Sequence, residues 1–112
     1  MELIDIRVLG CTGLLNSKSS ACTVYHQENL LLHIKSLSLE LCKPSICISK
    51  SNGPLKFTIT QFQSHTLSVI VPVSLLTTGK VWIPLFSQEK EINSLDMNTS
   101  EKLLIINNGL PV

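Results

Sequence analysis

The chain is poor in charge. Charged residues make up 15% of it, whereas soluble domains usually carry about 25%. Nine basic residues nearly balance eight acidic ones, for a formal net charge of +1. Strong nucleic-acid binding usually shows as a basic excess, so we expect no nucleic-acid partner. A hydrophobic content of 44% also excludes disorder, because disordered chains combine high charge with low hydrophobicity.

Long apolar runs are also missing. The longest, Val69–Val73, has the length of a strand, whereas a membrane-spanning helix needs about 18 apolar residues or more. Met1 is followed by the acidic Glu2 and Asp5 and not by the basic and apolar regions of a signal peptide. We therefore expect an intracellular, cytoplasmic domain, with a position at the periphery of a membrane or of cytoskeletal structures left open. The 112 residues fit one domain over 1–112, on its own or as one module of a longer chain.

No pair of cysteines has the C-x-x-C spacing that structural zinc sites favour. The four cysteines are Cys11, Cys22, Cys42 and Cys47. Without a secretory signal we expect them to be reduced and to act as small hydrophobic residues. We therefore predict no metal site.

Catalytic and cofactor motifs are absent as well. His26, His33 and His65 lie in three separate segments, and none of them accompanies a nucleophile elbow. Cys11 lies between Gly10 and Gly13, but few basic residues near it in sequence would activate a thiol. The sequence contains no phosphate-binding loop and no dinucleotide fingerprint. We expect a protein that is not an enzyme and binds no cofactor.

Apolar and polar residues alternate along most of the chain, which is typical of strands with one buried face. The strands predicted in this way are Ile4–Leu9, Ala21–His26, Leu30–Leu41, Ser45–Lys50, Leu55–Gln61, Thr66–Val73, Lys80–Phe86 and Lys102–Asn107. Turn residues such as Asn52-Gly53 separate them. About eight short strands with turns between them predict an all-β, antiparallel two-sheet sandwich.

Two segments fit more than one structure. Leu30–Leu41 alternates like a strand at its end, yet it also carries a helical apolar stripe. Because its neighbours are strands, we predict a long, kinked strand with a bulge near Lys35 and Ser36. Ser87–Ser100 is polar and forms either a long loop or a short helix. Pro72 cannot donate a hydrogen bond, so its strand lies at a sheet edge or is bulged there.

Two stretches resemble the later strands of C2 domains. Leu67, Val69 and Val71 match the strand that enters a calcium-binding loop of that family, and Gly79 followed by Ile83-Pro84-Leu85 matches the next strand. The opening segment LIDIRVLGCTGL also resembles a C2 first strand and loop, with Leu32–Leu39 as the alternative first strand. The resemblance implies a C2-like β-sandwich over about two thirds of the chain.

The departures from the C2 pattern concern calcium. Calcium-binding members place several aspartates in loops at one end, since a hard cation needs clustered carboxylate oxygens. This chain has two aspartates, Asp5 in a predicted strand and Asp96 near the C-terminus. The corresponding loop, Ser74–Thr78, has no carboxylate. The resemblance therefore implies a calcium-independent C2-like module.

Apolar residues also lie on the nominally solvent-facing side of two predicted strands. They are Ile70, Pro72, Trp82 and Pro84. If the two strands pair, these residues form an exposed patch around Trp82, and such patches mark partner surfaces. The alternative is that Ser87–Ser100 or another segment covers them. We predict a protein–protein interaction or scaffolding function, with these four residues as the contact.

Lysines provide the alternative function. Lys43, Lys50 and Lys56 fall in the middle of the chain, and a basic strand face in C2 domains often docks on anionic phospholipid. The simpler interpretation is a solvated face with lysines that protect an edge. A third class is an immunoglobulin-like adhesion domain, in which Asn98-Thr99-Ser100 would be a glycosylation site. That class requires a secretory route.

Overall fold

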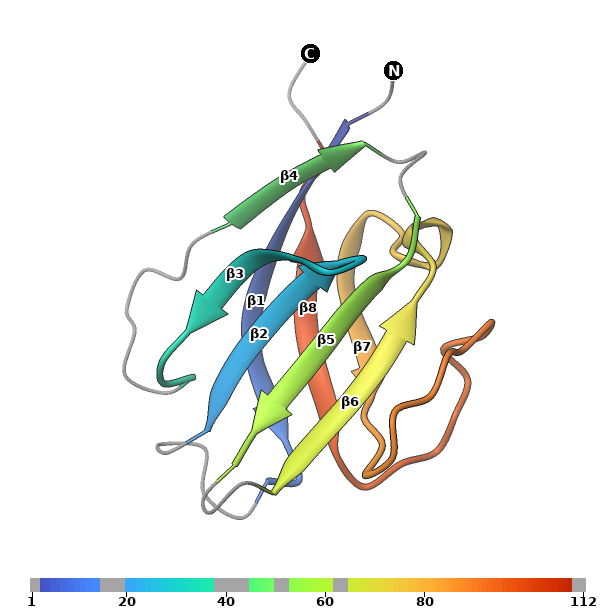
Figure 1. Cartoon of the computed structure of the whole chain (residues 1–112). Coiled ribbons are helices and arrows are strands. Elements are labelled where there is room, and N and C mark those ends of the chain that lie inside the picture. Colours follow the sequence, from blue (N-terminus) through green and yellow to red (C-terminus); the bar gives the residue numbers. More distant parts are fainter. Residues whose placement is uncertain (1–2, 15–19, 38–44, 50–52, 62–64, 110–112) are drawn as a thin grey trace.

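The computed structural model describes residues 3–14, 20–37, 45–49, 53–61 and 65–109. These residues form two antiparallel four-stranded sheets packed face to face (Figure 1). Sheet A has the order β4 (Ser45–Ser49), β1 (Leu3–Thr12), β8 (Lys102–Asn107), β7 (Gly79–Pro84). Sheet B has the order β3 (Asn29–Ile34), β2 (Ala21–His26), β5 (Leu55–Thr60), β6 (Thr66–Val71). The prediction of an all-β, antiparallel two-sheet sandwich with eight strands is confirmed.

The core lies between the sheets and follows the predicted alternation. Sheet A contributes Ile6, Ile83 and Ile105, and sheet B contributes Phe57 and Val69, all of them fully buried. Burial of each such side chain stabilises the fold by about 1.5–3 kcal/mol relative to exposure. This inward set is what a two-residue period places on one face of each strand.

Two strands, β1 and β3, depart most from the prediction. β1 runs beyond the predicted end at Leu9 to Thr12, with a register shift between Val8 and Gly10. β3 ends at Ile34, because the chain leaves the ladder and the Leu37 amide donates instead to the Ser20 carbonyl, at 3.0 Å. The last part of the predicted strand to Leu41 lies outside the described residues.

β6 and β7 do not pair, although they follow each other in sequence. β6 ends at Val71, just before Pro72, and a single 3-10 turn over Val73–Leu75 carries the chain to the opposite sheet. The buried Asn107 side chain donates to the Leu76 carbonyl at 2.6 Å and so ties this crossing to β8. Within the described residues no helix is long and apolar enough to cross a membrane.

Residues 85–101, which we call the connector, join the neighbouring strands β7 and β8 by a detour to sheet B (orange in Figure 1). The Ser68 amide donates to the Phe86 carbonyl at 2.8 Å, and the Ile70 amide to the Lys90 carbonyl at 2.8 Å. The Ile92 amide donates back to Ile70 at 3.0 Å, and the Ile92 side chain is buried in the core. Ser87–Ser100 is thus a loop that pairs with the outer edge of β6.

The connector returns to β8 against Gly13. This glycine has φ +82°, and a Cβ there would overlap the carbonyl group of Ser100. We expect Gly13→Ala to lower the free energy of unfolding by about 2 kcal/mol or more, from left-handed strain and overlap with backbone. Gly109→Ala is the control, since Gly109 has φ +63° but open space around its Cβ position. Gly109→Ala should therefore lower the free energy of unfolding by about 1 kcal/mol, from the left-handed strain alone. Equal shifts of the urea midpoint in both variants would contradict the close approach at Gly13.

The attachment of the connector can be tested at Ile92. We expect Ile92→Ala to cost about 2–5 kcal/mol, because it removes a buried side chain and leaves a cavity. The exposed neighbour provides a control, and Asn93→Ala should change stability by less than about 0.5 kcal/mol. Hydrogen exchange should quicken at the Ser68 and Ile70 amides in Ile92→Ala, because their acceptors belong to the connector. Unchanged exchange at these two amides would show that the pairing does not depend on Ile92.

Candidate functional site

Trp82 is the most prominent side chain on the outer face of sheet A. It lies on β7 and is 47% exposed, although tryptophan is a large apolar residue. Leu104 lies directly opposite it on β8, and Ile106 is the next outward residue of the same strand. Both are half-buried, so their side chains reach the surface beside the indole. We call the outward surface formed by Arg7, Lys80, Trp82, Lys102, Leu104 and Ile106 the Trp82 face.

Cations surround the apolar part of the Trp82 face. Ile106 pairs with Arg7 of β1 on one side and with Lys80 of β7 on the other. Lys102 lies on the far side of Leu104, as the preceding outward residue of β8. None of these three cations has an acidic partner among the described residues.

The four strands of sheet A contain a single acidic residue, Asp5 on β1. Its carboxylate accepts a hydrogen bond from the Asn108 side chain at 3.3 Å. Asp5 lies beyond Arg7, one outward position further from the Trp82–Leu104 row. The Trp82 face therefore combines an apolar centre with unpaired positive charge.

The structure separates the four residues predicted as one partner-binding patch. β6 and β7 belong to different sheets, so Ile70 and Pro72 do not adjoin Trp82 through strand pairing. Ile70 is half-buried, and its N–H and C=O groups both bond to the connector at the outer edge of β6. Pro84 shares the outward phase of Trp82 but is buried. The condition for a single patch, pairing of these two strands, is therefore not met, and Trp82 is the exposed member of the set.

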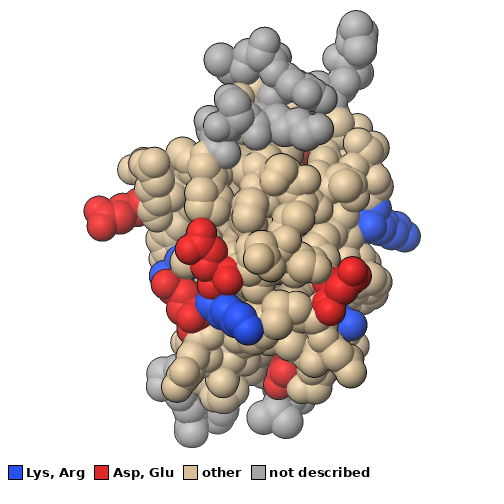
Figure 2. Space-filling view, turned by 90° about the vertical axis from the view of Figure 1, so that its right-hand side faces the viewer, with Lys and Arg blue, Asp and Glu red and all other residues tan. Residues whose placement is uncertain are grey.

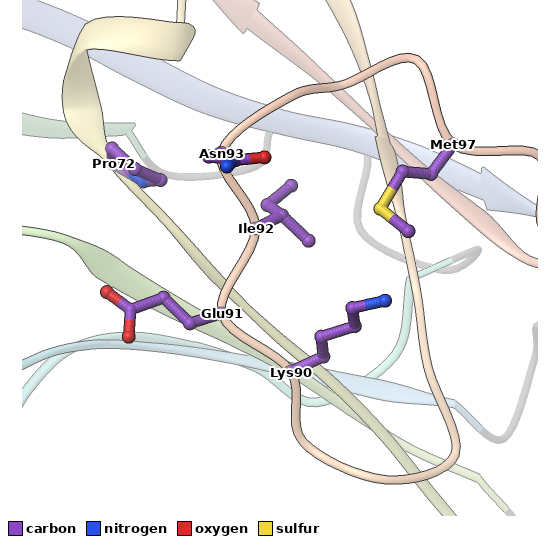
Figure 3. Close-up of a pocket in the computed structure, with 6 residues that line it drawn as sticks. All are labelled: Pro72, Lys90, Glu91, Ile92, Asn93 and Met97. Carbon is purple, nitrogen blue, oxygen red and sulfur yellow. The ribbon is translucent and has the colours of Figure 1, made fainter.

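Pro72 lies instead at a hollow of about 540 Å³ between the end of β6 and the connector. In Figure 3 the side chains of Lys90, Ile92 and Met97 point toward one another, and the carboxylate of Glu91 points away. The surrounding surface mixes acidic and basic side chains in small groups around a largely uncharged area (Figure 2). The hollow has neither one sign of charge nor a set of convergent polar groups.

Of the three lysines predicted for lipid binding, the structure describes Lys56, whereas Lys43 and Lys50 lie outside the described residues. The Lys56 ammonium lies 2.7 Å from a carboxylate oxygen of Glu89 in the connector and 5.7 Å from the centre of the Tyr25 ring. Such a half-exposed ion pair stabilises by at most about 1 kcal/mol. Lys56 nevertheless already has an acidic partner within the domain.

Several polar side chains on the outer face of sheet B bind one another. Thr23 lies 3.1 Å from His33, and Thr58 lies 3.1 Å from Ser68, each pair joining two strands. The Lys56–Glu89 pair adds the connector to this set. The two outer faces of the sandwich therefore differ, since the sheet B face pairs several of its polar groups internally.

The candidate catalytic residues stay apart. His26 and His33 lie on neighbouring strands of sheet B, and His65 is exposed just before β6. Cys11 is half-buried within β1 and not in a glycine turn. Among the described residues no group of three or more His, Cys, Asp or Glu side chains is placed to hold a metal ion.

Leu104 and Ile106 were not predicted as site residues, although the sequence carries a signal for them. Leu103–Ile106 is four apolar residues in a row, so β8 is apolar on both faces. A strand of this kind has an apolar outward side that some other group covers or contacts.

Comparison with protein-family models, with curated proteins and with solved structures finds no match for this chain.

Proposed function

We propose that the chain is a non-catalytic, calcium-independent C2-like module for protein–protein interaction or scaffolding, and that the Trp82 face is its contact surface. The observation that carries the proposal is the exposure of Trp82 beside Leu104 and Ile106. Tryptophan is enriched among the residues that dominate binding energy at interfaces, where it is desolvated by the partner.

The contrast between the two outer faces supports this choice of surface. The sheet B face pairs its polar groups with one another, as in Thr58 with Ser68 and Lys56 with Glu89. The Trp82 face leaves three cations without an acidic partner among the described residues and leaves a large apolar ring half in solvent. Both features cost little in water and become favourable when a complementary surface covers them.

The non-catalytic and calcium-independent parts of the proposal depend on the residues at the end of the sandwich. The C2 resemblance implies that Ser74–Thr78, within the crossing from β6 to β7, takes the place of the loop that carries acidic ligands in calcium-binding members. These residues include no carboxylate. Calcium needs about six to eight oxygen ligands, several of them carboxylates, gathered around one ion.

Docking on anionic phospholipid through Lys43, Lys50 and Lys56 is the alternative. The pairing of Lys56 with Glu89 weighs against it, because a lysine that is already neutralised gains less from an anionic surface. We therefore place the protein-interaction function first.

The proposal predicts that Trp82→Ala abolishes selective protein capture by the immobilised domain. Quantitative mass spectrometry of captured proteins should reveal a set bound by the wild-type domain and lost from the variant, because the truncated side chain removes the apolar centre of the contact. Leu30→Ala is the matched control, since Leu30 is another large apolar residue, 59% exposed on β3 of the opposite sheet.

The variant should keep its fold, because a side chain that is already half in solvent contributes less to stability than a core residue. The urea midpoints of Trp82→Ala and Leu30→Ala provide this check. The same captured set from wild type, Trp82→Ala and Leu30→Ala would rule out the Trp82 face as the contact surface.

A further inference from the structure

The free edge of β7 offers unpaired backbone groups next to the Trp82 face. The Leu85 amide donates to the Glu101 carbonyl at 3.1 Å, which continues the hydrogen-bonded pairing of Val81 and Ile83 with β8. Hydrogen-bonded and non-hydrogen-bonded pairs alternate in an antiparallel ladder, so the N–H and C=O groups of Lys80 and Trp82 point away from β8. No hydrogen bond joins them to another described residue.

The neighbouring edge shows the contrast. β6 is the edge strand of sheet B on the same side of the sandwich (Figure 1), and its outward amides at Ser68 and Ile70 are already bonded to the connector. Pro84 has no N–H group, so it ends the row of donors on β7 after Trp82. The open stretch is therefore short and is centred on Lys80 and Trp82.

The side chains next to this stretch indicate what would bind there. Lys80 and Trp82 project to the same side of sheet A, two residues apart, with Arg7 and Lys102 further across the face. A strand added to β7 would place every second side chain on that side, one beside Lys80 and one beside Trp82. Charge complementarity then calls for a carboxylate at the first position and an apolar group at the second.

We propose that the partner of the Trp82 face is an extended acidic segment of another protein, in which an acidic and an apolar residue lie two positions apart and which adds to β7 as a strand. This inference rests on the proposed function and specifies its partner class. The backbone pairing distinguishes such a segment from a lipid surface, because only a polypeptide continues a ladder from Lys80 and Trp82.

A second copy of the chain fits less well. Pairing of two β7 edges would bring two Trp82 faces side by side, each with unpaired Arg7, Lys80 and Lys102. Like charges across an interface disfavour it, whereas an acidic side chain on a partner strand would neutralise Lys80.

The test uses the emission of Trp82, which is the single tryptophan of the chain. The probes are a short peptide that repeats Glu-Ser-Val-Ser, which places glutamate and valine on the same side of a strand, the same peptide with lysine for glutamate, and the glutamate peptide with every backbone amide methylated. We expect a saturable blue shift with the first peptide alone, since the second has the wrong charge and the third cannot complete the ladder. Lys80→Glu should weaken binding of the first peptide at least about fivefold. The exposed Lys35→Glu is the matched control and should leave binding unchanged.

Five results would overturn the inference. Equal binding of the methylated peptide would rule out strand addition, and equal binding of the lysine peptide would rule out charge selection. A blue shift with phosphatidylserine vesicles and with no peptide would identify a lipid surface instead. A dimer in analytical ultracentrifugation that Trp82→Arg dissociates would identify a second copy as the occupant. If no peptide binds but the capture experiment still shows proteins lost with Trp82→Ala, the proposed function stands and this partner class does not.

Discussion

The pairing of the connector with β6 is the contact on which the arrangement of the surface depends. β7 and β8 are neighbours in sheet A and a tight hairpin could join them, yet residues 85–101 travel to the far sheet and back. Three backbone hydrogen bonds hold them there, and Ile92 is buried in the core at that point. This route closes the open side of sheet B, where an unpaired edge would otherwise invite association with other chains.

Because the connector covers the edge of β6, the edge of β7 is the one on this side of the sandwich at which another strand could pair. The two edge strands on this side, β6 and β7, use the same outward phase of backbone groups, but those of β6 are bonded to the connector. On β7 the matching groups of Lys80 and Trp82 have no partner among the described residues. Pro84 limits that edge to a short stretch, which is a common way to restrict uncontrolled sheet extension while a specific contact stays feasible.

The sequence predicted strands and their buried faces well, because a two-residue period encodes both directly. β2 and β8 have the predicted bounds, and Gln61 is buried as the phase of its strand requires. What the period does not encode is which strand lies beside which. Consecutive strands pair in only about two thirds of cases, and the crossing after Pro72, anchored by the distant Asn107, is an exception that no local pattern reveals.

Because strand order could not be predicted, the structure separates the predicted partner-binding patch, although Trp82 is exposed as its strand phase predicted. The outward phase of Trp82 depends on β7 alone, so it could be predicted, whereas the neighbours of Trp82 depend on strand order, which brings in Leu104 and Ile106 from the end of the chain. The low charge content gives these neighbours their weight. Only 15% of the residues are charged, and several polar side chains of the sheet B face are paired with one another. The Trp82 face instead places three cations that have no acidic partner among the described residues around an exposed indole, and the proposed contact surface rests on this difference.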